Sequence, residues 1–423
     1  MNQSADYPRF RWLILISAVL GYITLQVTNL AVAPVLPQIA KSLNMNLGTA
    51  SNLVMTPFLF SGCIILVLAG GAVCDRFGVL TAILMGLACA TIPAALMPWI
   101  GHSATAVLWA RIVEGFAAGF LFPAMGPIIG LWFPVHQKGL AGGLMSASIA
   151  VGSAAGVMGG PAVFAAVSNW QAMSAWLSIV GWVSLVFTGI LAIMSRPKLP
   201  VQMAPPDGAS DSTIFKRALF SWFTVTGIIV TFVTAWNLHC LFSLTPTFLA
   251  ADKPVGAGYG SMTAGQLMLG VTLFAGVVGP IVSGLLLDRV FHGNAKPAFL
   301  VGFALLCVFV YALKVPAVTG NKAVLEVALI LAGFGINFVF PTVYYFIARS
   351  YAPQIVGKMS GLWAGIGTFG GVLGLYIAGV TVKSQNSYQT TFSLQVLVAV
   401  IGFLLTFVLI KLRKAEQAVL TGQ

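Results

Sequence analysis

The stretch GFAAGFLFP, from Gly115 to Pro123, recurs 218 residues later as GFGINFVFP, from Gly333 to Pro341. Five of the nine positions are identical, and both copies lie inside long apolar segments. A second string also repeats: GGAVCDRFG at Gly70–Gly78 places Asp beside Arg, and so does SGLLLDRVFHG at Ser283–Gly293. Two motifs that repeat in the same order, about half a chain apart, predict two structurally equivalent halves.

The composition indicates that most of the chain lies in lipid. Of the 423 residues, 59% are hydrophobic and 7% are charged, whereas soluble domains carry about 25% charged residues. Apolar runs of about 18 residues or more recur along the whole length, and each can cross a ~30 Å hydrocarbon layer as a helix. The short alternating pattern of membrane strands is absent. We therefore predict an all-α integral membrane protein.

Twelve membrane-spanning helices are predicted, over residues 12–38, 48–73, 79–100, 104–130, 138–166, 172–194, 218–249, 261–287, 296–315, 323–348, 357–382 and 389–412. The first apolar run is too long for a signal peptide and is expected to be retained. The longest polar gap, 195–217, separates six spans from six. It predicts a cytoplasmic linker between a six-helix bundle over 1–194 and a second bundle over 218–423, which face each other across a central pathway.

The distribution of Lys and Arg predicts the orientation. Fifteen of the 21 basic residues fall on the side of the N-terminus, Arg111 lies inside a span, and five fall on the other side: Lys41, Lys253, Lys314, Lys322 and Lys383. Positive charge collects on the cytoplasmic side, so both termini are predicted to be cytoplasmic. The formal charge of +12 then reflects topology and contact with anionic lipids, and nucleic acid is not an expected partner.

Several classes of chemistry have no motif in the chain. The five cysteines have no CxxC spacing, which favours buried thiols over disulfides or a metal site. The sequence contains no GxxxxGK[ST], HExxH or GxSxG, so neither ATP-driven pumping nor hydrolysis is supported. We expect a transporter that is monomeric and not an enzyme, with no cofactor and no metal. A channel is the alternative class, and saturable flux with trans-stimulation would distinguish a carrier from a pore.

With these features the chain resembles the major facilitator superfamily over nearly its full length. The loop between spans 2 and 3 matches the family's GxxxDRxG signature through Gly71, Asp75, Arg76 and Gly78, and the second copy keeps Gly284, Asp288 and Arg289. Span 4 carries the family's RxxxGxxxG pattern as Arg111, Gly115 and Gly119. The resemblance implies alternating access, with Asp75, Arg76, Asp288 and Arg289 as gating residues on the cytoplasmic side.

The chain also departs from the family patterns. Val79 and Leu80 stand where a second basic residue often follows the first signature. The antiporter signature of span 5 is partly met, through Gly152, Gly156 and Gly160–Pro161, but Phe164 and Ala165 stand in place of its closing glycine pair. Glycines in spans 5 and 11 still predict close helix contacts.

Ionisable groups inside a span are costly and usually functional. Arg111 and Glu114 lie roughly 10 and 15 Å below the outer boundary of span 4. Their i,i+3 spacing places them on one face. Leu329 and Ala332 occupy the equivalent positions of the second half, so the fold itself does not require the charges. Arg111 is expected either to bind an anionic substrate or to form a structural pair with Glu114 or with carbonyls of span 1.

Further candidates are polar and aromatic residues within spans. We expect substrate contacts from Tyr22, Gln26 and Asn29 in span 1, from Trp236, Asn237 and His239 in span 7, and from Asn337 and Tyr344 in span 10. Glu114 is the candidate proton carrier. His239 and Asn337 could instead join neighbouring helices by hydrogen bonds.

Together these features predict a secondary transporter of the cell inner membrane that moves a small organic anion, of the carboxylate class. Transport would be coupled to protons or to a counter-anion, by symport or antiport. The string GLWFPVHQKGLAGG after span 4 also resembles facilitators for monocarboxylates, nitrate and similar metabolites. The alternative is a proton-coupled efflux antiporter for drugs or amphipathic metabolites.

Overall fold

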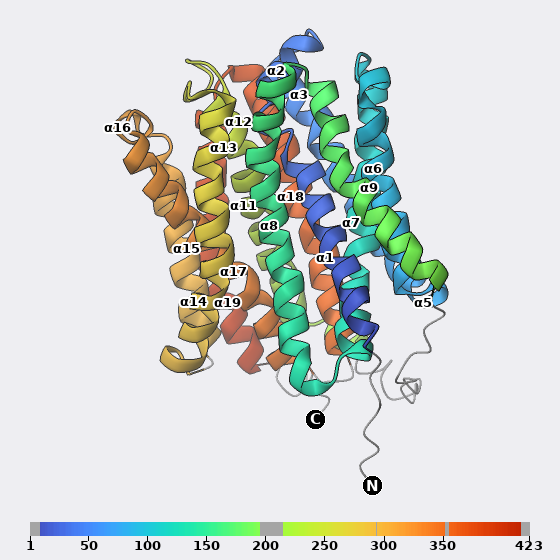
Figure 1. Ribbon diagram of the computed structural model, residues 1–423. Coiled ribbons are helices and arrows are strands. Elements are labelled where there is room, and N and C mark those ends of the chain that lie inside the picture. The colour runs from blue at the N-terminus through green and yellow to red at the C-terminus, as the bar shows by residue number, and fades with distance from the viewer. Residues whose placement is uncertain (1–8, 195–214, 293, 352–354, 416–423) are drawn as a thin grey trace. The chain divides into compact units, whose positions relative to one another are not determined.

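The computed structural model describes residues 9–194, 215–292, 294–351 and 355–415. These residues form helices joined by short turns, and no strand occurs among them. Twelve helical stretches among the described residues are long and apolar enough to cross a membrane (Figure 1). The predicted all-α fold and the number and order of spans are therefore confirmed. Most of the predicted linker, 195–217, lies outside the described residues.

The chain divides into two compact units. Unit 1 comprises Met1–Met203, Leu249–Asp252 and Gly258–Leu269, and unit 2 comprises Ala204–Phe248, Lys253–Ala257 and Gly270–Gln423. The end of span 7 and the first part of span 8 therefore group with unit 1.

Unit 1 is built from helices that form the first six spans and the first part of span 8. They are α1 (Arg11–Leu30), α2 (Leu36–Ser42), α3 (Leu47–Val54), α4 (Thr56–Ile65), the π-helical η1 (Leu66–Gly70), α5 (Gly71–Phe77), α6 (Val79–Ile100), α7 (Ala104–Trp132), α8 (Val135–Val167), α9 (Trp170–Met194) and most of α13 (Gly260–Gly270).

Unit 2 contains the remaining helices. They are α11 (Trp222–His239), η2 (Cys240–Leu244), most of α12 (Thr245–Ala250), η3 (Val271–Val278), α14 (Gly279–Leu285), η4 (Leu286–Val290), α15 (Ala295–Ala312), α16 (Pro316–Thr319), α17 (Lys322–Ser350), α18 (Val356–Gln385) and α19 (Gln389–Ala415). Three of these segments, η2, η3 and η4, are π-helical and interrupt spans 7 and 8.

The first span differs from its prediction. We expected one helix over 12–38, but α1 ends at Leu30, and a turn precedes α2, which begins at Leu36. Pro34 and Pro37 lie in this region. A proline removes a backbone donor and disfavours helical geometry in the residue before it, which accounts for the break.

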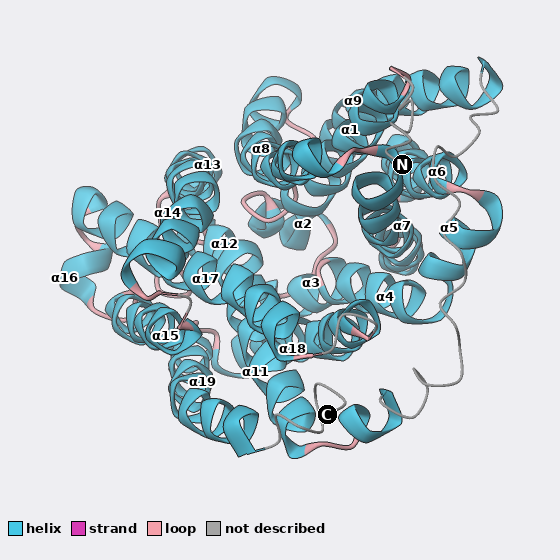
Figure 2. Cartoon of the chain, turned by 90° about the horizontal axis from the view of Figure 1, so that it is seen from below, coloured by secondary structure: helices cyan, strands magenta, loops and turns pink. Residues whose placement is uncertain are grey.

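Equivalent helices pack in the same pairs in both units. In unit 1, α1 packs on α8, and α6 packs on α7 and α9. In unit 2, α11 packs on α18, and α15 packs on α17 and α19 (Figure 2). The internal repeat that the sequence predicts is thus present in the helix packing of each unit.

The glycines of spans 5 and 11 face these helix contacts. A Cβ atom at Gly156 of α8 would lie 3.2 Å from Cα of Val27 on α1. A Cβ atom at Gly374, 218 residues later on α18, would lie 3.1 Å from the ring of Trp236 on α11. The predicted close contacts of the two glycine-rich spans are therefore confirmed.

Candidate functional site

The candidate site lies in unit 1 and is centred on α7. Gly115, one residue after Glu114, brings α7 close to α4, because a Cβ atom there would lie 2.1 Å from the carbonyl oxygen of Phe58. Beside it, Ser61 Oγ of α4 donates to the Ile112 carbonyl at 2.8 Å. The tight contact with α4 fixes the turn of α7 that carries Arg111.

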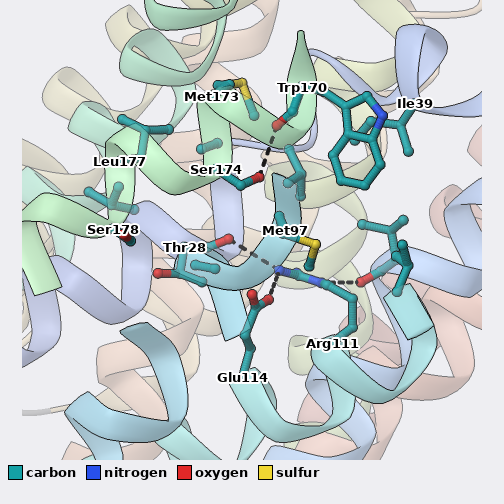
Figure 3. A pocket seen from close by; sticks show the side chains of 16 residues that line it. Thr28, Ile39, Met97, Arg111, Glu114, Trp170, Met173, Ser174, Leu177 and Ser178 are labelled. Carbon is teal, nitrogen blue, oxygen red and sulfur yellow. Dashed lines mark hydrogen bonds and ion pairs between the residues drawn. The ribbon is translucent and has the colours of Figure 1, made fainter. Parts of the chain in front are cut away.

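Arg111 binds three elements of unit 1 (Figure 3). Its Nη1 lies 2.5 Å from Oε2 of Glu114 and 3.3 Å from the Thr28 carbonyl of α1. Its Nε donates to the Val54 carbonyl of α3 at 2.7 Å. The guanidinium carbon also lies 4.6 Å from the ring centroid of Phe58. The structure therefore contains both contacts that we considered for a structural pair, the glutamate and a carbonyl of span 1.

The pair is almost fully removed from solvent. The side chains of Arg111 and Glu114 are 3% and 2% exposed. Moving a charge from water into an apolar interior costs several kcal/mol per ion, so each group depends on the other to remain charged there. Among the described residues, Lys41 and Asp252 form the other ion pair, at an exposed position of unit 1.

A small cavity lies beside the pair. It is lined by residues of α1 and the turn after it, by residues of α6, α7 and α9, and by Ile39 of α2 and Val54 of α3, and most of its lining is apolar. Its polar lining includes Thr28, Ser174 and Ser178 (Figure 3). The Nη2 atom of Arg111 is buried and has no acceptor among the described residues. The site thus has one strong hydrogen-bond donor that no group in the described part of the chain uses.

Unit 2 shows what the fold requires at this position. Leu329 and Ala332, which correspond to Arg111 and Glu114, are both fully buried in α17. The same helix packing is therefore made with apolar residues, which agrees with the prediction that packing alone does not explain the charges.

The three span 1 candidates do not converge on the pair. Tyr22 donates its hydroxyl to the Leu121 carbonyl of α7 at 2.9 Å. Gln26 donates from Nε2 to Ser153 Oγ of α8 at 2.8 Å, so these side chains contact different helices. Asn29 is half-buried.

Three span 7 candidates lie in unit 2. Trp236 packs against Gly374 of α18. Asn237 is fully buried, and its Nδ2 donates to the Val233 carbonyl in its own helix at 2.9 Å. His239 is half-buried at the end of α11.

The span 10 candidates lie on α17. Asn337 donates from Nδ2 to the Gly333 carbonyl at 2.9 Å, within its own helix. Tyr344 is 40% exposed, and its ring centroid lies 5.4 Å from that of Phe340. Asn337 and Tyr344 are separated by about two helical turns of α17.

The predicted gating residues lie at the ends of π-interrupted spans. The α5 helix, which contains Asp75, ends at Phe77 and is followed by Gly78, whose φ of 87° is a conformation that glycine adopts readily. Arg76 is exposed, with its guanidinium carbon 5.4 Å from the ring centroid of Phe77. In the second copy Arg289 is exposed in η4, and the chain turns at His292, with a φ of 48°. The carboxylates of Asp75 and Asp288 lie outside the described side chains.

Three polar residues near the candidates were not predicted from the sequence. Gln395 of α19 is buried and donates from Nε2 to the Asn237 carbonyl at 3.3 Å. Ser174 and Ser178 line the cavity beside Arg111. The spacing of Trp170, Ser174 and Ser178, four residues apart each time, was the available signal, because such residues share one helix face.

Twelve apolar spans in the described part of the chain, two repeated units and a buried ion pair in one of them make up the architecture of a membrane transporter. The profile of the Major Facilitator Superfamily matches residues 14–316 and 254–423, and the chain belongs to this superfamily. A solved structure titled as a bacterial homologue of the human lysosomal transporter Spinster has a TM-score of 0.69, with 13% identity, and covers 97% of this chain and 98% of its own.

Curated relatives carry two kinds of name. A probable chloroplastic anion transporter 2 of Oryza sativa subsp. japonica is 24% identical over 87% of this chain and 69% of its own length. A probable chloroplastic anion transporter 3 of Arabidopsis thaliana is 28% identical over 33% of this chain, and the match spans 27% of that relative. The quinolone resistance protein NorA of Staphylococcus aureus is 32% identical over 28% of this chain and 30% of its own.

Proposed function

We propose that the protein moves a small organic anion, of the carboxylate class, across the cell inner membrane by alternating access. Transport is coupled to protons or to exchange for a second anion. The observation that carries this proposal is the Arg111–Glu114 pair, which is buried in unit 1 and has apolar residues at the equivalent positions of unit 2. A guanidinium presents a planar fork that matches a carboxylate.

In this proposal the Glu114 carboxylate occupies the position on Arg111 that the substrate carboxylate takes during transport. A proton on Glu114 removes its negative charge and weakens its hold on Arg111. Arg111, which stays protonated, then binds the substrate carboxylate instead. One proton and one anion would thus be taken up together, and the interior of unit 1 would keep its neutral charge balance.

The relatives support an anion as substrate. The match that spans 87% of this chain is to a protein named as a probable anion transporter. We further propose that Tyr22, Gln26 and Asn29 in unit 1, and Trp236, Asn237, His239, Asn337 and Tyr344 in unit 2, contribute substrate contacts. His239 has a ring N–H that can donate to an anion.

The Asp–Arg pairs complete the proposed cycle. Asp75 and Arg76, with Asp288 and Arg289, would stabilise the closed cytoplasmic side. Asp75 would do so at the positive end of a neighbouring helix dipole. An Asp75→Asn variant that keeps the wild-type balance of inward- and outward-open states would contradict this role.

A second candidate function is proton-coupled efflux of drugs or amphipathic metabolites. It is favoured by the similarity to a quinolone resistance protein over 28% of this chain and by the partly matched antiporter signature at Gly152 and Gly156. Glu114 would then carry the exchanged proton, and Arg111 would have no substrate to bind.

A ligand screen separates the two candidates. Ligands that bind the folded state raise its unfolding temperature by mass action. The purified protein is heated with carboxylates, inorganic oxyanions or lipophilic cations, and compounds that stabilise it are tested for counterflow in proteoliposomes. The anion proposal expects stabilisation and counterflow by carboxylates, both reduced in Arg111→Gln. Stabilisation by lipophilic cations alone would favour efflux.

A further inference from the structure

The cavity beside Arg111 is large enough for water. The space open to the centre of a water molecule is about 20 Å³, and a site needs at least about 10–15 Å³ by this measure to hold one. Met97 and Met173 contribute to its apolar wall, and both are nearly inaccessible from outside. Buried water also needs polar partners, usually two to four.

Arg111 supplies the first of these partners. Its Nε and Nη1 are occupied by carbonyls and by Glu114, but Nη2 is buried without an acceptor among the described residues. Leaving a charged donor unpaired in an apolar interior is costly. A water oxygen in the adjoining cavity would accept from Nη2.

One face of α9 supplies further partners. Trp170, Ser174 and Ser178 follow one another at intervals of four residues and all line the cavity. Ser174 Oγ donates to the Trp170 carbonyl at 3.1 Å, and Ser178 Oγ donates to the Ala175 carbonyl at 2.7 Å. Because each hydroxyl proton is used within the helix, the oxygen lone pairs remain to accept from water.

This polar face leads away from the ion pair toward one end of unit 1. The Nε1 of Trp170, the first residue of α9, donates to Ser42 Oγ at the end of α2, at 2.7 Å. From Ser178 to Trp170 is a distance of about 12 Å along the helix axis. The face therefore runs from the cavity beside Glu114 toward the end of the unit that is predicted to face outward. The Trp170 N–H only donates, so it holds Ser42 in place and does not itself relay a proton.

We propose that the cavity is an internal water site and that this water and the serine face of α9 form the route by which Glu114 gains and loses its proton. The inference rests on the proposed role of Glu114 as proton carrier. For each step the serine hydroxyl turns from its helix carbonyl toward the next oxygen of the chain. That oxygen accepts one proton as it gives up its own, so one O–H bond forms as one breaks, and the carboxyl group of Glu114 ends the chain. Protons thus reach Glu114 through unit 1.

The charges around the cavity favour water over a free anion. Arg111 and Glu114 are the charged residues of its lining, and their charges cancel. No other titratable side chain of the described residues lines it. An anion would need a net positive site, whereas water needs only the donor and acceptors that are present.

Radiolytic labelling tests the water site without any transport assay. Short X-ray exposure makes hydroxyl radicals from bound water, and these oxidise nearby methionine to sulfoxide, a readily detected product. Met173 beside the cavity and Met145 elsewhere in unit 1 are both fully buried. The proposal expects rapid oxidation of Met173 and Met97 and slow oxidation of Met145. Equal protection of all three would overturn the water site.

Removal of the two serine hydroxyls tests the route. Ser174→Ala/Ser178→Ala is compared with Ser184→Ala, because Ser184 is also buried on α9 and bonds its own helix but lies outside the cavity. Proton-coupled carboxylate uptake should slow by about tenfold in the double variant. This is the change in rate expected when the loss of one hydrogen bond of ordinary strength raises the barrier. Counterflow exchanges substrate without net proton release, so the double variant should keep the wild-type rate of counterflow. Ser184→Ala should keep the wild-type rates of both uptake and counterflow.

The outcomes separate the route from the function on which it rests. If Glu114→Gln abolishes proton movement while the double serine variant transports at the wild-type rate, the route is wrong and the proposed function stands. If Glu114→Gln leaves proton movement intact, the carrier role and the route both fail. An equal loss of uptake in Ser184→Ala would also overturn the route.

Discussion

Arg111 and Glu114 neutralise each other inside unit 1, with 2.5 Å between Nη1 and Oε2. They lie about one turn apart on α7, and carbonyls of α1 and α3 bind further guanidinium donors. The pair is neutral as a whole, but removal or protonation of Glu114 leaves a buried positive charge. This imbalance gives a reason for an anion to bind when a proton does.

The first prediction concerns stability. Glu114→Ala should destabilise the protein by about 3–5 kcal/mol, because it leaves Arg111 as an unpaired buried charge. The double variant Arg111→Leu/Glu114→Ala reproduces Leu329 and Ala332 of α17 and should recover most of that loss. Thermal and denaturant unfolding in detergent would measure both variants. A double variant that is less stable than Glu114→Ala would show that the charges are needed for folding.

The second prediction concerns the contact that holds α7 against α4. A Cβ atom at Gly115 would lie 2.1 Å from the Phe58 carbonyl oxygen, so Gly115→Ala should separate the two helices and reduce both folding yield and transport. Gly126 of the same helix has open space around it. Gly126→Ala should therefore be neutral or stabilise by up to about 1 kcal/mol, the helix preference of alanine. Similar unfolding temperatures for the two variants would contradict the account.

The third prediction concerns the turn after Asp75 and Arg76. Gly78 has a φ of 87°, so Gly78→Ala should cost about 1–3 kcal/mol in backbone strain. Gly71 has neither a positive φ nor a neighbour that a Cβ atom would meet, and Gly71→Ala is the matched control. Unfolding temperatures would compare them, and equal values would mean that the turn does not need glycine.

Much of the fold could be predicted from the sequence, because the length of each apolar run and the repeated motifs indicate the spans directly. The breaks inside spans were harder. Pro34 and Pro37 were visible in the first span, but the turn that starts at Ala31 depends on local geometry. The π-helical segments of spans 7 and 8 carry no composition signal that sets them apart from ordinary helix.

The sequence predicted the two charged residues of the site but not the groups that surround them. The spacing of Arg111 and Glu114 predicted their pairing, since i,i+3 contacts are local. The carbonyls of Thr28 and Val54, and the serines of α9, are brought to Arg111 by packing between distant segments. For the same reason the spacing of Tyr22 and Gln26 could not show that one bonds α7 and the other α8.

The fourth prediction concerns the shape of the cation. Arg111→Lys keeps the charge but replaces a planar fork of donors by a point charge. Carboxylate counterflow should fall by about tenfold or more, the effect of losing about one charge-assisted hydrogen bond. Arg217→Lys, at an exposed position, should leave counterflow unchanged. Full counterflow in Arg111→Lys would contradict direct carboxylate binding by the guanidinium.

The most direct test of the central claim is the proton movement that accompanies carboxylate transport in Glu114→Gln. Gln keeps a side chain of similar size but cannot release a proton. Labelled carboxylate and the internal pH of proteoliposomes are recorded together for the wild type and the variant. We predict that exchange of labelled for unlabelled carboxylate persists in Glu114→Gln while net proton movement disappears. Proton movement at the wild-type ratio to carboxylate would contradict the claim that the Arg111–Glu114 pair couples the two.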